Sequence, residues 1–224
     1  MLCLPSMRKP SALCLACWCI ALSAQAQGFK FSNPPPGAQA EAQAQAQRAA
    51  KVESQLSTPC RDRIKNRKIL VLIGEETNGM IAAGQGAFSR HVEAVNTRLK
   101  NLGLKTYSAE QIRKQIAQEE IDAYFKNDPD RALSASRRMA AQYVLRGVIA
   151  SRAMRNAMVN VNQVSVNMNF TLTDAAGRPV STASASNESY AGNDTSGMAL
   201  TLIEERADEV VAQLYSDYCR NVAK

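Results

Sequence analysis

The chain has 224 residues, of which 46% are hydrophobic, and Lys and Arg outnumber Asp and Glu by 27 to 20. This length allows one ordinary domain with a real core, or two very small ones. The full chain has a net charge of +7, and no aromatic residues interleave with the basic cluster from Arg61 to Lys68, so nucleic-acid binding is not indicated. We interpret that cluster as a solvent-exposed segment that leads into a strand.

The first 26 residues have the layout of a secretory signal peptide. Arg8 and Lys9 precede an apolar run from Ala12 to Leu22, and Ala24-Gln25-Ala26 follows as an A-x-A cleavage site. The run is too short for a membrane span, and no later stretch is apolar enough to be one. We therefore expect cleavage after Ala26 and export to the periplasm. The two cations leave with the signal, which lowers the net charge from +7 to +5.

Cysteine usage agrees with export. Four of the six Cys residues lie in the signal, which leaves Cys60 and Cys219. In an oxidising compartment these two are most simply a disulfide that joins the ends of the folded region. The alternatives are a two-ligand metal site or two free thiols. A lipid anchor on Cys17 is a further alternative, but the preceding Cys14-Leu15-Ala16 fits that processing signal poorly.

Residues 27–58 are rich in Gln, Ala and Pro. Pro34-Pro35-Pro36-Gly37 cannot be helical, whereas the Ala-Gln alternation from Ala38 to Arg48 favours a helix but has no apolar face to bury. We expect a flexible tether with a frayed helix in its second half. It either lets the domain reach a partner or is an unselected amino-terminal tail. The folded domain is expected over residues 59–224.

The domain is predicted to begin with a buried strand and an amphipathic helix. The apolar run from Lys68 to Gly74 predicts an interior strand, and a Gly-rich loop to Gly86 follows it. Apolar residues then recur at helical spacing until Gly103, which ends the helix. These residues are Phe88, Val92, Val95, Leu99 and Leu102. Leu104 to Tyr107 is expected to form a second strand.

Two helices are expected next. Ser108 and Gln111 form a capping box at the start of the first one. Its buried face consists of Ile112, Ile116, Ile121, Tyr124 and Phe125. The segment from Asn127 to Asp130 ends this helix and starts a second, which runs to about Ala141.

The longest regular pattern runs from Gln142 to Asp174 and predicts two strands joined by a polar loop. Tyr143 to Ala150 is apolar enough for a strand buried on both faces. After the loop, Met154 to Asn162, the alternation has period two and predicts one buried and one polar face. The first face holds Val164, Val166, Met168, Phe170 and Leu172, and the second holds Gln163, Ser165, Asn167, Asn169, Thr171 and Thr173. A break in the alternation places a bulge, or the loop itself, near Asn162.

The turn Asp174-Ala175-Ala176-Gly177, with Gly where a positive φ is wanted, leads into a third strand from Arg178. A loop with Gly192 and Asn193 then leads to a long final helix. Its apolar stripe is Met198, Leu202, Ile203, Val210, Val211, Leu214 and Tyr218. The order of elements predicts one α/β (α+β) domain, with a mixed sheet, a carboxy-terminal antiparallel meander and a cover of helices.

No pattern assembles an active site. The loop from Gly74 to Gly86 lacks the third small residue of a dinucleotide fingerprint and the Lys of a phosphate-binding loop. Glu75 and Glu76 are adjacent and diverge, so they make a poor carboxylate pair. Ser89 points away from the single histidine, His91, which argues against a catalytic triad, and one His is too few for a metal site. We predict no catalytic residue, cofactor or metal.

The polar face of the second central strand is unusual, because amides are poor strand formers and solubility does not require them. One interpretation is a surface that hydrogen-bonds a partner strand or a glycan. The other is a solvent-exposed sheet face without a binding function. The candidate partner-binding residues are Glu75, Glu76, Asn78, Asn167 and Asn169.

Four segments resemble the anticodon-binding-like α/β domain of bacterial envelope proteins. Its members include the LpoB-type lipoprotein activators of penicillin-binding proteins, the curli secretion protein CsgG, the TolB amino-terminal domain and a domain of the flagellar protein FlgT. The segments are the strand Lys68 to Gly74, the helix end Asn101-Leu102-Gly103, the stretch Ala141 to Gly147, and the strand end and turn from Leu172 to Gly177. The last two look like the family's "tyrosine, valine, hydrophobe, x, glycine" strand and its "hydrophobe, x, aspartate, x, x, glycine" turn.

The resemblance implies an exported, non-catalytic domain that binds another envelope protein as an assembly factor or activator, with outer-membrane association left open. Two features depart from the family. The signal is of the cleavable kind, whereas the activators and the curli protein are lipoproteins, and the Met154 to Asn162 loop is too short and polar for a membrane-spanning hairpin. The alternative is a periplasmic small-molecule or glycan-binding protein that uses the Gly79 to Gly86 loop, and a third hypothesis is a hydrolase that uses His91.

Overall fold

The computed structural model describes residues 37–84, 89–126 and 128–221. The predicted signal peptide, residues 27–36 of the predicted tether and Phe88 lie outside these ranges. From Ala40 on, the described residues form one compact unit. The described helices are α1 Ala38–Leu56, α2 Arg61–Ile64, α3 Ser89–Asn101, α4 Ala109–Gln115, α5 Gln118–Phe125, α6 Pro129–Arg138 and α7 Thr195–Asn221. The described strands are β1 Lys68–Thr77, β2 Met80–Ala82, β3 Lys105–Thr106, β4 Tyr143–Asn156, β5 Val161–Asp174 and β6 Pro179–Ala191.

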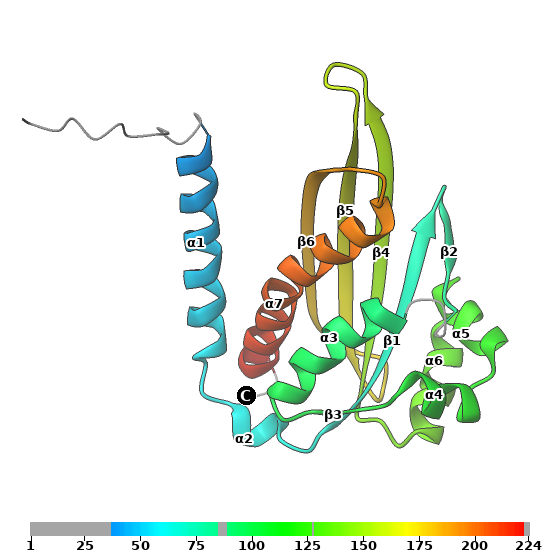
Figure 1. Ribbon diagram of the computed structural model, residues 1–224. Helices are drawn as coiled ribbons and strands as arrows, with labels where there is room; N and C mark the ends of the chain where they lie inside the picture. The colour runs from blue at the N-terminus through cyan, green and yellow to red at the C-terminus, as the bar shows by residue number, and fades with distance from the viewer. Residues whose placement is uncertain (1–36, 85–88, 127, 222–224) are drawn as a thin grey trace, which may run out of the picture. The chain divides into compact units, whose positions relative to one another are not determined.

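The strands form one mixed sheet in the order β2-β1-β4-β5-β6, and the short β3 pairs with β1 (Figure 1). Strand β1 is parallel to β3 and β4, because helices connect them, whereas β4, β5 and β6 form an antiparallel meander. The predicted α/β class, mixed sheet and carboxy-terminal meander are therefore confirmed. The predicted helix ends and turns also hold, since Gly103 and Gly177 have φ angles of 97° and 81°.

Helix α1 occupies the second half of the predicted tether. Its Ala, Gln and Glu residues have high helix propensity, and none of its 19 residues is buried. Near its carboxyl end, the Gln55 side-chain amide donates a hydrogen bond to Gln213 Oε1 of α7.

The predicted Gly-rich loop after Gly74 is wrong over its first half. Strand β1 continues through Glu75 and Glu76 to Thr77, and Met80–Ala82 pairs with it as β2. Asn78 and Gly79 form the turn, with φ angles of 53° and 79°. Asn-Gly with two positive φ angles is the preferred two-residue hairpin turn, so the signal for this hairpin is present in the sequence.

The predicted first helix after β3 is broken in two. The capping box at Ser108 and Gln111 is confirmed, but Ile116 is extended, with φ −124° and ψ 123°, and ends α4. Helix α5 starts again at Gln118, where Glu120 accepts a hydrogen bond from the Ala117 N–H group. The break lets the apolar residues on both sides of it enter one buried cluster, which includes Ile112, Ile116, Ile121 and Phe125.

The central hairpin is longer than predicted, because the strands extend into the expected Met154 to Asn162 loop. Only residues 157–160 connect β4 to β5, and Asn160 there has a φ of 54°. The break that the sequence shows in the period-two alternation corresponds to this turn and not to a bulge within β5. A register shift lies elsewhere, between Leu172 and Thr173 in the pairing of β5 with β6.

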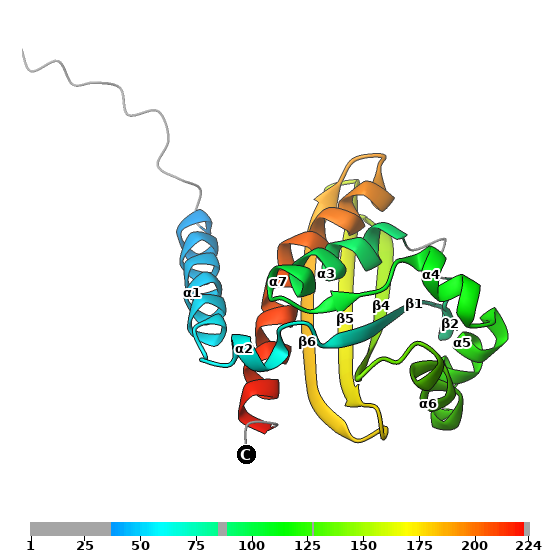
Figure 2. The ribbon, with the colours of Figure 1, turned by 90° about the horizontal axis from the view of Figure 1, so that it is seen from below.

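Helices α3 and α7 lie side by side on one face of the sheet (Figures 1 and 2). They are joined by Arg98, which forms an ion pair with Asp208 at 2.7 Å and also donates to the Glu204 carbonyl. The predicted buried face of β5 packs beneath them, with Val164, Val166, Met168 and Phe170 each 1% exposed.

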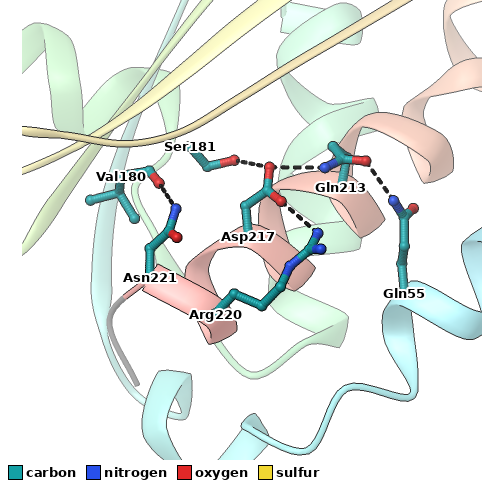
Figure 3. A network of polar contacts seen from close by, with 7 residues as sticks. All are labelled: Gln55, Val180, Ser181, Gln213, Asp217, Arg220 and Asn221. Carbon is teal, nitrogen blue, oxygen red and sulfur yellow. Dashed lines mark hydrogen bonds and ion pairs between the residues drawn. The ribbon is translucent and has the colours of Figure 1, made fainter. Parts of the chain in front are cut away.

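Side chains at the carboxyl end of α7 form hydrogen bonds with the start of β6 (Figure 3). The Asp217 carboxylate accepts hydrogen bonds from Ser181 Oγ and Gln213 Nε2, both at 2.9 Å, and pairs with Arg220 at 2.7 Å. Two residues further on, Cys219 forms a disulfide with Cys60, and the two Cα atoms are 5.7 Å apart. The domain's first and last segments are thus linked covalently.

Candidate functional site

The second face of the sheet is only partly covered. Helices α4, α5 and α6 pack over β1 and the start of β4, where Leu70, Leu72 and Val144 are buried. Beyond them, β4, β5 and β6 present a face without a helical cover, which we call the open face. It includes the exposed residues Arg152, Met154, Asn167, Asn169, Thr182, Ser184, Ser186, Glu188 and Tyr190. The prediction that β4 is buried on both faces is therefore wrong for Arg146, Val148 and Ala150, which are half-buried.

The middle of the open face is lined by amides and hydroxyls. Strand pairing places Asn167 beside Ser186 and Asn169 beside Ser184, in successive rows. The intervening Met168 points into the core on the other side and is fully buried. Among the described residues, neither Asn side chain has a hydrogen-bond partner. These two candidate residues therefore lie together, with unused donors and acceptors facing outward.

A cation and an aromatic ring border the open face where α5 meets β4. The Arg146 guanidinium lies 5.8 Å from the Tyr124 ring centre and 5.0 Å from that of Phe125. It donates to the Phe125 carbonyl at 3.3 Å, but its buried Nε has no acceptor among the described residues. Strand pairing places Arg146 beside Thr171, one row from Asn169. Burial raises the pKa of Tyr124, although Arg146 and a hydrogen bond with Thr173 oppose that effect.

The other three candidate residues divide between the two faces. Glu76 shares the side of the open face, and its register partner Ala150 is in turn paired with Asn167. Glu75 points to the opposite side, where it accepts a 2.8 Å hydrogen bond from Ser151 Oγ. Asn78 lies in the exposed β1–β2 turn. The structure thus brings Glu76, Asn167 and Asn169 onto one face and leaves Glu75 and Asn78 apart from them.

His91 is expected to titrate below its ordinary pKa. Burial lowers the pKa of its imidazole from 6.5, and the Glu75 carboxylate partly opposes this. The folded state therefore favours the neutral ring, and this contribution to stability is complete above pH 6.5 and is lost as the pH falls through the lowered value. NMR titration can follow the chain's one His directly. We expect a midpoint below 6.5, lowered again by Glu75→Gln. A midpoint at or above 6.5, or one raised by Glu75→Gln, would contradict this assignment.

The other alternative sites are described only in part. Gln85 and Gly86, at the end of the loop in the small-molecule alternative, lie outside the described residues. No group of three or more His, Cys, Asp or Glu in the described ranges is placed to hold a metal ion. A core cavity of about 30 Å³ lies under Tyr143, Tyr215 and Tyr218. It is the size of one water molecule. A larger, open hollow of about 460 Å³ is lined mainly by polar residues of β5, β6 and α7, among them Asn167, Asn169 and Arg206. Within residues 37–84, 89–126 and 128–221, no helix is both long and apolar enough to cross a bilayer.

Searches with family models and among curated proteins give no match for this chain. Solved structures similar to it include a lipoprotein from Neisseria meningitidis, 16% identical, which covers 64% of this chain and 97% of that one with a TM-score of 0.45. Another is the LpoB C-terminal domain from Salmonella enterica, 20% identical, covering 62% and 93%, with a TM-score of 0.39. A third is a PelC dodecamer from Paraburkholderia phytofirmans, 18% identical, covering 65% and 88%, with a TM-score of 0.41.

An LpoB domain is thus among the similar structures, as the sequence resemblance predicted. The resemblance to CsgG, TolB, FlgT and the anticodon-binding-like fold stays a prediction. All three TM-scores lie below 0.5, so no partner, site residue or function is carried over from these proteins.

Sequence reasoning missed Arg146 and Tyr124 as parts of the site. A signal for Arg146 exists, because an Arg inside the apolar stretch Tyr143 to Ala150 is out of place in a strand buried on both sides. No comparable signal places Tyr124 beside it, since that contact depends on how α5 docks against β4.

Proposed function

We propose that this chain is an exported, non-catalytic accessory protein of the bacterial cell envelope that acts by binding another envelope protein. The signal-like first 26 residues and the Cys60–Cys219 pair support export to an oxidising compartment such as the periplasm. On this proposal, residues 27–58 are the tether between the mature amino terminus and the domain at 59–224. The partner contacts the open face.

The observation that carries the proposal is the outward row of unbonded amides and hydroxyls at Asn167, Asn169, Ser184 and Ser186. Each Asn offers two donors and an acceptor, and short Ser side chains leave the surrounding strand surface accessible. The side chains lie on a preformed surface, because Met168 and Phe170 anchor the same strand in the core. Such preorganisation reduces the entropy lost on binding.

The chemistry of the face fits a folded polypeptide better than a small ligand. The face is broad, and the hollow of about 460 Å³ that Asn167, Asn169 and Ser184 help to line is open and polar, whereas small-molecule pockets are mostly apolar. Its border supplies Arg146 and Tyr124, residue types enriched at protein interfaces. An acidic or amide-rich partner surface would complement it. Glu76, on the same side, would contact a donor or cation of that partner.

The proposal is tested by site-specific photocrosslinking in intact cells. A photoreactive residue is placed at Asn169 or Ser184, and in the matched control at Asn101, an exposed amide on α3 beyond the opposite face. We expect one discrete adduct with an envelope protein from the two open-face positions and none from position 101. We also expect the Ser184 adduct to weaken in the Asn167→Lys/Asn169→Lys variant, while circular dichroism shows an unchanged fold. An adduct of equal strength from Asn101, or none from the open face, would count against the proposal.

A further inference from the structure

The turn between β4 and β5 exposes an unusual amount of apolar surface. We call Met154 to Val161 the hairpin tip. Its large apolar side chains are Met158, which is 95% exposed, Met154 (66%), Val159 (56%) and Val161 (39%). Only two other large hydrophobic residues in the described ranges, Met80 and Tyr190, are exposed. Exposed apolar residues grouped at one place mark interaction surfaces more often than isolated ones do.

These apolar side chains are not needed to form the turn. Asn156 Oδ1 accepts hydrogen bonds from the Met158 and Val159 N–H groups at 3.0 and 3.3 Å, and the Asn160 N–H group donates to the Asn156 carbonyl at 2.8 Å. Asn160 adopts the left-handed conformation, which Asn tolerates well, and its Oδ1 accepts from Arg155 Nε at 2.8 Å. The asparagines therefore define the turn, and none of these hydrogen bonds requires an apolar side chain at its apex.

The hairpin tip is cationic. Arg155 lies in it and Arg152 lies two residues before its start, while the sequence from Arg131 to Thr173 contains no Asp or Glu. Two carboxylates share the face of Arg152: Glu188 lies in its row two strands away on β6, and Glu76 of β1 pairs with Ala150, one row further from the tip. Figure 1 shows the β4–β5 hairpin extending past the amino end of α7, so its apex can contact a surface without obstruction by α3 and α7.

We propose that the hairpin tip binds an anionic lipid surface. Met158 and Val159, with Met154 and Val161 behind them, enter the interfacial layer, and Arg152 and Arg155 contact headgroup phosphates. Apolar side chains flanked by cations are the combination that peripheral membrane segments use. The tip has no aromatic residue, whereas protein-binding hot spots favour Trp and Tyr. A connection of four residues inserts only shallowly, because a spanning strand needs about 9–11 residues in the bilayer.

The test measures binding of the mature chain, residues 27–224, to vesicles of phosphatidylethanolamine with and without phosphatidylglycerol. The mature chain has no tryptophan, since Trp18 lies in the signal, so Met158→Trp supplies a single reporter. We expect co-flotation and a blue shift of its fluorescence with the anionic vesicles only. Met158→Asp should lower the vesicle partition coefficient about tenfold, as expected for losing the burial of one apolar side chain. Arg152→Gln/Arg155→Gln should weaken binding to the anionic vesicles.

The matched controls are Met80→Asp and Met80→Trp, because Met80 is 74% exposed on the other hairpin, β1–β2. Neither control should change binding or show a blue shift. Equal binding by Met158→Asp and the wild type, or equal loss with Met80→Asp, would overturn the proposal. It would also be overturned if binding did not depend on phosphatidylglycerol. Loss of the open-face crosslink in Met158→Asp, with vesicle binding unchanged, would assign the tip to the protein partner instead.

Discussion

Removing the disulfide with Cys60→Ala/Cys219→Ala is expected to lower the free energy of unfolding by about 2–5 kcal/mol. The bond closes a loop spanning 159 sequence positions, and long loops gain most from closure in the chain-entropy model. Both sulfur-bearing residues are 5% exposed, so the variant also loses packing around them. Urea unfolding of the two proteins under oxidising conditions measures the difference.

Reduced wild-type protein is the matched control, and it should unfold close to the midpoint of the double variant. Non-reducing peptide mapping of protein isolated from cells with its thiols blocked tests the bond itself. Free thiols at both positions, together with equal stability of wild type and variant, would mean that the bond does not form in the cell.

Phe170→Ala is expected to cost about 3–5 kcal/mol, the usual range for deleting a buried aromatic ring. Phe170 is 1% exposed, and its ring lies over Gly147, its register partner on β4. A Cβ atom at position 147 would overlap that ring. Gly147→Ala alone should therefore cost about 1–3 kcal/mol through overpacking. Gly147 does not have a positive φ, so no backbone strain adds to this cost.

The two changes should not be additive. In Gly147→Ala/Phe170→Ala the new methyl group occupies part of the space that the ring leaves, so the double variant should be more stable than the sum of the single losses implies. Urea unfolding of all four proteins gives the coupling free energy. Additivity within about 0.5 kcal/mol would show that the ring and the glycine do not share this space.

The same pair shows what sequence alone could and could not provide. The period-two pattern of β5 predicted that Phe170 is buried, and the resemblance marked Gly147 as part of a motif. Only the β4–β5 register supplies the physical reason, which is close approach of an aromatic ring to a strand backbone.

Local signals predicted local structure well. The capping box at Ser108 and the positive φ angles at Gly103 and Gly177 depend on neighbouring residues only, and all are present. The β1–β2 hairpin was missed although Asn78-Gly79 signals it, because the apolar run of β1 ends before it. The open face could be predicted only for β5. Its full extent depends on how far α4, α5 and α6 spread over the sheet, which is a property of tertiary packing.

The strand pairings of this sheet differ in the sequence separation of the residues that they bring together. The pairs β4–β5 and β5–β6 join neighbouring segments, whereas β1–β4 joins distant ones. Strands β4, β5 and β6 are consecutive, so short turns can bring them together. Strand β1 must find β4 across a long interval, since Lys68 and Gln142, which are hydrogen-bonded at the start of this pairing, are 74 residues apart. Such distant contacts form slowly. In a chain that crosses a membrane from its amino end, β1 would emerge first and remain unpaired until β4 arrived, exposing its five buried apolar residues, Ile69 to Ile73, in the meantime.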